Sequence, residues 1–212
     1  MLTGPVVFVV DDDLSVRTAI SRLLASVGLP VHAFASAAEF MAQLECSPAG
    51  CLILDVRMPG CSGLDLQRRL IDEGYELPVI FVSAHADVAV TVRAMRAGAL
   101  QVFTKPFDDQ ALLDTVYEAL VQDRESQAER EDLIDVRFRL SQLTARERQV
   151  LTLVVTGMPN KQIASELGTS EKTVKFQRGR VMHKMQAPSV ADLVRMADRL
   201  AVSGDLTPWQ KG

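Results

Sequence analysis

The chain has 212 residues, 48% of them hydrophobic, and a formal net charge of −4, values that suit two small globular domains with separate cores. No apolar run reaches the roughly 18 residues that span a bilayer, and the first residues, MLTGP, lack the features of a secretory signal, so we expect a cytoplasmic protein without membrane contact. Cys46, Cys51 and Cys61 form neither an even disulfide set nor CxxC pairs, which argues against a disulfide framework or a zinc site.

The first half of the chain alternates short apolar segments with longer segments of helical periodicity. The apolar segments, rich in Val, Ile or Phe, predict strands at 6–10, 31–34, 52–55, 79–82 and around 102–103. The segments between and after them predict helices at 14–26, 39–44, 64–71, 88–97 and 109–122. Ser36 and Glu39 have the spacing of a capping box, which supports the start of the second helix. Such alternation predicts an α/β domain whose parallel sheet is covered by helices on both faces.

Residues 123–140 are predicted to link this domain to a second one. The segment begins with DRESQAERED, which is polar and free of Gly and Pro, and helix-forming residues dominate it, so it could extend the preceding helix. A flexible tether is almost as compatible with this composition, because a helix without an apolar stripe gains little from packing.

The segment 141–200 predicts an all-α domain of four helices. Thr144 and Glu147 have the spacing of a capping box at the start of its first helix. The run KQIASEL predicts a two-turn helix, and Ser170 caps a longer basic helix, TVKFQRGRVMHKM. A short helix, a tight turn and a longer basic helix make a helix-turn-helix. Residues 201–212 are expected to form a loosely ordered tail.

Charge is distributed unevenly between the two predicted domains. Residues 1–122 carry 8 basic and 15 acidic side chains, whereas residues 141–200 carry 10 basic and 5 acidic ones. An acidic domain suits a site for a hard cation, and a small basic domain is typical of a nucleic-acid binder. Ordinary solvation of two unrelated surfaces is the competing interpretation.

Polar side chains follow the carboxyl ends of the predicted strands, the edge where an open parallel sheet binds its ligands. They are Asp11, Asp12 and Asp13 after the first strand, Asp55 at the end of the third, Ser83 after the fourth, and Lys105 with Pro106 after the fifth. Clustered carboxylates repel one another unless a cation joins them, and an all-oxygen set suits Mg²⁺. No GxxxxGK[ST] or GxGxxG motif follows any strand, and the spacing of Gly60 and Gly63 is too weak to count as one. We therefore predict a phosphoryl-transfer site whose phosphate donor is another molecule.

The segments FVVDDD, LDVRMPG, VSAH and TKPF, in this order and at these strand ends, closely resemble the receiver domain of two-component response regulators. The resemblance covers about residues 1–122 and implies a five-stranded, doubly wound, flavodoxin-like fold with strand order 2-1-3-4-5. It implies that Asp55 is the phospho-acceptor nucleophile. It further implies that Mg²⁺, for which Mn²⁺ is a possible substitute, binds Asp11, Asp12, Asp55 and the backbone carbonyl of Arg57, and that Ser83 and Lys105 bind phosphoryl oxygens.

One position departs from this resemblance. The residue three before Lys105, often a Tyr or Phe that switches conformation, is Val102 here, which puts an aromatic version of the switch in doubt. Ser83, contacting the phosphoryl group and moving its loop, would remain as the switch. Phe103 is a weaker substitute that packs more readily in the core.

Four further residues surround the predicted phosphate. His85 and Arg57 each lie two residues beyond a predicted site residue and could shape hydrolysis of the acyl phosphate, although exposed loop residues without kinetic effect are an equal alternative. The resemblance implies a cis peptide bond before Pro106. Cys61 is interpreted as an ordinary loop thiol, because no base or partner cysteine accompanies it.

The run LTARERQVLTLVVTGMPNKQIASELGTSEKTVKFQRGRVMHKM resembles the four-helix LuxR/NarL-type DNA-binding domain, and with the preceding domain the architecture is similar to the FixJ branch. The recognition helix would begin at Ser170 and enter the major groove. Candidate base contacts are Lys175, Phe176, Gln177 and Arg178, and candidate phosphate contacts are Lys161, Lys172, Thr173, Arg180 and Lys184. Gln177 replaces a common histidine and Phe176 a small aliphatic residue, so relatives do not predict the operator. Basic residues that merely solvate a helix are the alternative.

These observations predict a transcription regulator with no enzymatic role beyond Mg²⁺-dependent self-phosphorylation and autodephosphorylation. A cognate sensor histidine kinase would phosphorylate Asp55, and the chain would dimerise, bind a two-fold DNA site and regulate transcription, usually by activation through RNA polymerase. A phosphatase or phosphotransferase is one alternative, but it would need a substrate domain and an acid–base carboxylate where Arg57 stands. A binding protein that accepts no phosphate is another, against which the complete set of site residues argues.

Overall fold

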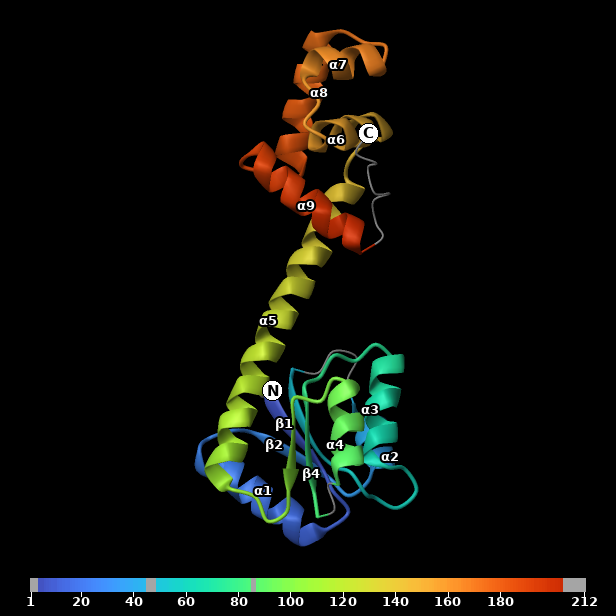
Figure 1. Cartoon of the computed structure of the whole chain (residues 1–212). Helices are drawn as coiled ribbons and strands as arrows, with labels where there is room; N and C mark the ends of the chain where they lie inside the picture. The colour runs from blue at the N-terminus through green and yellow to red at the C-terminus, as the bar shows by residue number, and fades with distance from the viewer. Residues whose placement is uncertain (1–3, 45–48, 85–86, 204–212) are drawn as a thin grey trace. The chain divides into compact units, whose positions relative to one another are not determined.

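The computed structural model describes residues 4–44, 49–84 and 87–203 and divides the chain into two compact units, Met1–Gln127 and Ala128–Gly212 (Figure 1). The first unit contains one parallel sheet in the order β2-β1-β3-β4-β5, which confirms the predicted strand order. Its strands are β1 Val6–Val10, β2 Val31–Phe34, β3 Gly50–Asp55, β4 Val79–Ser83 and β5 Gln101–Thr104. Its helices are α1 Leu14–Ser26, α2 Ala37–Gln43, α3 Gly63–Asp72, α4 Val88–Arg96 and the first part of α5 Asp109–Ser141.

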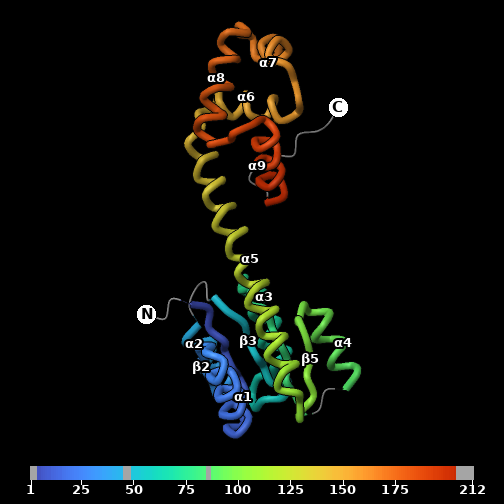
Figure 2. Tube along the Cα trace, turned by 90° about the vertical axis from the view of Figure 1, so that its left-hand side faces the viewer, coloured from blue at the N-terminus to red at the C-terminus, as the bar shows by residue number. Residues whose placement is uncertain are grey.

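Helices cover both faces of this sheet because successive side chains along a strand point to opposite sides. Helix α1 and the first part of α5 lie on one side, and α2, α3 and α4 lie on the other (Figure 1). Figure 2 views the side that α1 and α5 cover. On β3, Ile53 belongs to the core beneath α1 and α5, whereas its neighbours Leu52 and Leu54 belong to the core beneath the other helices. Every residue of β3 is buried, as expected for the central strand of a doubly covered sheet.

Side-chain caps fix where several of these helices begin. The Ser36 hydroxyl accepts a hydrogen bond from the backbone N–H of Glu39, and the Glu39 carboxylate accepts one from the N–H of Ala35. The second helix therefore starts at Ala37, two residues earlier than predicted, because Ser36 is its N-cap. Asp13 likewise caps α1 by accepting from the N–H of Ser15.

Helix α5 is continuous from Asp109 to Ser141, so residues 123–140 are helical in the structure. In the first unit, the buried Asp123 carboxylate accepts a hydrogen bond of 2.8 Å from the backbone N–H of Gly50 at the start of β3. In the second unit, Val136 and Leu140 on α5 belong to the helical core. Tertiary contacts within each unit thus supply the packing that the polar composition of this segment does not predict.

Up to residue 203, where the described part of the second unit ends, it contains the end of α5 and four further helices: α6 Ala145–Val155, α7 Asn160–Glu166, α8 Glu171–Lys184 and α9 Val190–Val202. Val150, Ile163, Val181 and Leu193, one from each of these helices, are fully or almost fully buried in a single core. Helix α9 ends two residues beyond residue 200, the predicted end of the domain, and residues 204–212 of the predicted tail lie outside the described residues. Within the described part of the chain, no helix has both the length and the apolar character needed to cross a membrane.

Candidate functional site

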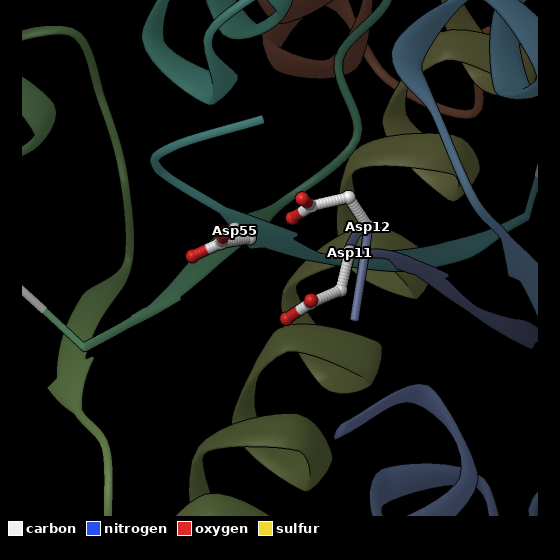
Figure 3. A group of neighbouring side chains, drawn as sticks. All are labelled: Asp11, Asp12 and Asp55. Atoms are coloured by element: carbon white, nitrogen blue, oxygen red, sulfur yellow. The ribbon is translucent and has the colours of Figure 1, made fainter. Parts of the chain in front are cut away.

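Three carboxylates gather at the carboxyl end of the sheet. Asp11 and Asp12 directly follow β1, and Asp55 is the last residue of β3, the strand paired with β1. One carboxylate oxygen from each lies within 4.8 Å of the others (Figure 3). Asp11 is 2% exposed and Asp55 7% exposed, whereas Asp12 is open to solvent. Three negatively charged oxygen donors on rigid strand ends, with one side open, fit a hard divalent cation such as Mg²⁺.

Lys105 contributes a positive charge to this cluster from the end of β5. Its Nζ donates to Oδ2 of Asp11 at 2.6 Å and lies 3.7 Å from Oδ1 of Asp55. The Lys105 backbone N–H donates to the carbonyl of Ser83 at 2.9 Å, which ties the two strand ends together. The peptide bond from Lys105 to Pro106 is cis, as the resemblance implied. The structure thus brings together Asp11, Asp12, Asp55 and Lys105, with buried Ser83 at the end of the intervening strand.

The electrostatics of the cluster favour binding of a cation. Burial raises the pKa of Asp55, and the neighbouring charges of Asp11 and Asp12 raise it further, while Lys105 lowers it. The net upward direction means that Lys105 does not fully offset burial and the charges of the two neighbouring carboxylates. A cation placed among the oxygens would favour the ionised form of Asp55, which is the nucleophilic form.

Arg17 and Gly63 hold the strand ends of the site in position, although the sequence does not predict either as a site residue. Nη1 of Arg17, on α1, donates to the backbone carbonyl of Asp11 at 2.6 Å. Gly63, the first residue of α3, donates its N–H to the carbonyl of Val56 at 2.9 Å, and a Cβ on Gly63 would lie 2.1 Å from the carbonyl oxygen of Asp55. A glycine is therefore required where α3 meets the end of β3. In the sequence, the spacing of Gly60 and Gly63 is the only signal for it, and that spacing is too weak to identify a motif.

The candidate switch residues lie on opposite faces of β5. Val102 packs against the core beneath α2, α3 and α4, whereas Phe103 packs against the core beneath α1 and α5. The Phe103 ring makes an edge contact with Phe107, with ring centroids 6.5 Å apart. Phe103 thus occupies a core position, which is the role that the sequence favoured for it.

Arg57 and Cys61, both predicted to lie beside the phosphate, differ in their exposure to solvent. The Arg57 side chain is exposed, although its backbone follows closely after Asp55. Cys61 is half-buried, and its thiol contacts the Ser62 carbonyl at 3.6 Å. Cys51 lies in the core, where burial raises the pKa of its thiol to about 12, so it is inert. His85 and Cys46 lie outside the described residues.

In the second unit, helix α8 follows the short helix α7 and a tight turn, as a helix-turn-helix requires. Inward-facing Val174 and Val181 fix α8 against the core. The predicted DNA contacts that are exposed are Lys161, Lys172, Thr173, Lys175, Phe176 and Arg180. These side chains form a predominantly cationic surface, which suits the polyanionic backbone of DNA.

Three other predicted DNA contacts are partly buried, and two of them bond to groups within the unit. Nη1 of Arg178 donates to Oδ1 of Asn160 at 3.1 Å. Nζ of Lys184 donates to Oε2 of Glu147 at 2.6 Å. The Oε1 atom of Gln177 is buried, with no hydrogen-bond partner among the described residues. The roles of these three residues in DNA binding stay predictions, but the structure turns them toward the protein.

Glu147, in the first turn of α6, contacts two cations of the basic helix α8. Its side chain has no exposed surface, completes the predicted capping box with Thr144, and lies 3.1 Å from Nε of Arg180. Burial alone would raise the pKa of Glu147, but the hydrogen bonds from Lys184 and Thr144 and the charge of Lys184 lower it to about 2. The sequence identified Glu147 only as a cap, because its cationic partners lie on another helix.

Comparison with known proteins assigns both units to families. The family described as response regulator receiver domain matches residues 7–117, and the family described as bacterial regulatory proteins, luxR family, matches residues 141–197.

Individual relatives match almost the full length of the chain. Nodulation protein W of Bradyrhizobium diazoefficiens is 45% identical, over 97% of this chain and 90% of that protein. Transcriptional regulatory protein FixJ of Azorhizobium caulinodans is 42% identical, over 95% of this chain and 97% of that protein. The solved structure of response regulator StyR, 45% identical, has a TM-score of 0.81 and covers 93% of this chain and 100% of StyR. The chain therefore belongs to the two-component response regulators, as a transcription regulator with a receiver domain and a LuxR-type DNA-binding domain.

Proposed function

We propose that Asp55 accepts a phosphoryl group from a sensor histidine kinase and that this modification promotes dimerisation and DNA binding. The observation that carries the proposal is the position of Lys105, whose Nζ lies 2.6 Å from Asp11 and 3.7 Å from Asp55, beside three clustered carboxylates. An ion pair with a purely structural role would need only one carboxylate. A second buried carboxylate costs free energy of folding unless it has a function.

The proposed metal site consists of the Asp11, Asp12 and Asp55 carboxylates and the backbone carbonyl of Arg57. Bound Mg²⁺, or Mn²⁺ in its place, would neutralise oxygens of the transferred group as negative charge develops on them. The oxygen-only donors and the exposed side of the cluster at Asp12 support this assignment.

In the proposed transfer, a carboxylate oxygen of Asp55 attacks phosphorus in line with the phosphorus–nitrogen bond of the kinase phosphohistidine. The new oxygen–phosphorus bond forms as the bond to the histidine breaks, and the histidine leaves with its electron pair. Lys105 exchanges part of its contact with Asp11 for a phosphoryl oxygen. The Ser83 hydroxyl donates a hydrogen bond to another phosphoryl oxygen. Most of the catalysis is therefore positioning and charge stabilisation.

The signal is proposed to leave the site through Ser83 and the end of β5. Ser83 and Lys105 are joined by a backbone hydrogen bond of 2.9 Å, so movement of one toward the phosphoryl group displaces the other. Val102 has no ring whose rotation could report the change. A serine-led movement of the strand ends is therefore proposed in place of an aromatic switch.

The output is proposed to be a dimer that places two copies of α8 on a two-fold DNA site and recruits RNA polymerase to activate transcription. One recognition helix reads only a few base pairs, so two copies supply the specificity that a single one lacks. The exposed cations of the second unit and the family of that unit support DNA as the partner.

Intact-mass analysis of the full chain with acetyl phosphate tests the phosphoryl acceptor. We expect a mass increase of one phosphoryl group that requires Mg²⁺ or Mn²⁺, disappears in Asp55→Asn, and persists in Asp72→Asn, a matched change at an exposed aspartate at the end of α3. Labelling of Asp55→Asn to the same extent as wild type would reject Asp55 as the acceptor.

A further inference from the structure

Phe176 presents an aromatic ring to solvent in the middle of the basic helix α8. The residue is 63% exposed, while the core contacts of this helix come from Val174 and Val181. Its neighbours Lys175 and Arg180 are exposed cations. An aromatic ring exposed within a cationic surface suits a partner that is both anionic and locally apolar.

A hollow of about 480 Å³ lies beside this ring, lined by Lys175, Phe176, Gly179, Arg180, His183 and Lys184. Gly179 forms part of it although it lies inside the helix. Apart from its chain neighbours and the backbone of the helix itself, a Cβ there would meet no atom of the described residues within 4 Å. A glycine inside a helix costs about 1 kcal/mol relative to alanine. Because packing within the unit does not require this glycine, the open space it leaves points to an approaching ligand.

Buried charge holds one wall of the hollow in place. The Arg180 guanidinium lies 5.9 Å from the centroid of the Phe176 ring, and its Nε lies 3.1 Å from Oε1 of Glu147. Lys184, on the same helix, bonds the other oxygen of Glu147 at 2.6 Å. The hollow is thus bounded by an aromatic ring, a glycine and an arginine that pairs with a buried carboxylate.

We propose that this hollow receives the 5-methyl group of a thymine in the DNA major groove, which makes Phe176 a specificity-determining residue. The cationic rim selects a polyanion, and the apolar wall selects an apolar group within it. Thymine is the base that offers such a group in the major groove, and Gly179 lets the base edge approach the helix closely. The inference rests on the proposed DNA binding by α8.

Removal of the methyl group from DNA tests this contact directly. The full chain, treated with acetyl phosphate and Mg²⁺, is used to select binding sites from a duplex library with a randomised central region. Each thymine of a selected duplex is then replaced singly by uracil, which lacks only the methyl group. We expect one position in each half-site at which the replacement weakens binding roughly 3- to 10-fold.

Two variants and a control assign this effect to the hollow. In Phe176→Ala, the affinity for the thymine duplex falls, and the difference between thymine and uracil disappears. In Gly179→Ala, the added methyl group fills part of the hollow and also reduces the difference, while the helix becomes more stable, so unfolding cannot explain the loss. Phe138→Ala, which removes a ring of similar exposure (64%) on α5, should keep the full difference.

The outcomes separate this inference from the function on which it rests. Selection that enriches no sequence would overturn both the proposed DNA binding and the thymine contact. Enriched duplexes whose affinity is unchanged by every uracil replacement would overturn the thymine contact alone. A uracil penalty that persists in Phe176→Ala would also overturn it, because the methyl group would then be read elsewhere.

Discussion

Nζ of Lys184 lies 2.6 Å from Oε2 of Glu147, a carboxylate without exposed surface. The two residues are 37 positions apart in the sequence and lie on different helices. The pair joins the start of α6 to the end of the recognition helix α8. Because Arg180 contacts the other oxygen of the same carboxylate, Glu147 determines where two cations of the DNA-binding domain point.

Replacement of Glu147 by Gln should destabilise the DNA-binding domain by on the order of 2–4 kcal/mol, because two cations lose their buried partner. The pKa of Glu147 is lowered from 4.5 to about 2 in the folded state, so its ionisation stabilises the fold fully above pH 4.5 and loses that effect as pH falls toward 2. Urea unfolding followed through amide resonances of α6 and α8 should show a difference from wild type that shrinks over this range. Glu166→Gln, at an exposed glutamate, serves as the control. A difference independent of pH would contradict the role of the charge.

Replacement of Gly63 by Ala should disturb the phosphoacceptor end of β3. The added Cβ would lie 2.1 Å from the Asp55 carbonyl oxygen, so α3 or the strand must shift, at a cost of about 1–3 kcal/mol. Asp55 should be labelled more slowly by acetyl phosphate, and the unfolding midpoint in urea should fall. Gly4→Ala is a matched control, because a Cβ at Gly4 meets nothing within 4 Å among the described residues. Equal labelling rates in the two variants would show that the contact does not position Asp55.

Replacement of Lys105 by Gln should affect metal binding and phosphoryl transfer in opposite directions. The variant loses the cation that lies 2.6 Å from Asp11 and 3.7 Å from Asp55, so Mg²⁺ should bind roughly 3- to 10-fold more tightly by calorimetric titration. Labelling by acetyl phosphate at saturating Mg²⁺ should slow at least about tenfold, because a donor to the phosphoryl group is missing. Arg93→Gln, at an exposed cation of α4, should change neither quantity. Weaker Mg²⁺ binding in Lys105→Gln would show that the lysine organises the carboxylates and does not compete for them.

Replacement of Asp123 by Ala should weaken the attachment of α5 to the receiver domain. The buried carboxylate accepts hydrogen bonds from the Gly50 N–H at 2.8 Å and from the Gln127 amide at 2.9 Å. Leaving the Gly50 N–H without this partner costs about 1–3 kcal/mol. Hydrogen exchange should accelerate in β3 and in the first part of α5, and the exposed Asp114→Ala on the same helix should not reproduce this. Unchanged protection of Gly50 in Asp123→Ala would contradict the assignment.

The sequence predicts the sheet and the acidic cluster because both depend on local pattern. Apolar segments mark the strands, and parallel strands end at a common edge, so Asp11, Asp55 and Lys105 are brought together by topology alone. The structure confirms the strand order and brings these three side chains within reach of one another. The roles of Arg17 and Gly63 could not be predicted in this way, because each depends on the distance between a helix and a strand end.

The orientation of the recognition helix was harder to predict for a geometric reason. The candidate base contacts were four consecutive residues, 175–178, but successive helical residues are about 100° apart and cannot all face outward. The structure exposes Lys175 and Phe176 and turns Gln177 and Arg178 partly toward the protein. Which residues face outward depends on how α8 packs against α6 and α7, and those contacts are separated in sequence.

Coupling between Asp55 and DNA is the central claim, and one comparison tests it directly. The affinity of wild type and Asp55→Asn for a selected duplex is measured with and without acetyl phosphate and Mg²⁺, together with the mass of the protein in solution. We predict that wild type dimerises and binds about 5- to 150-fold more tightly when phosphorylated, while Asp55→Asn does not respond. A phosphorylated wild type that binds no more tightly than the unmodified protein, or an equal response of both proteins, would contradict the account.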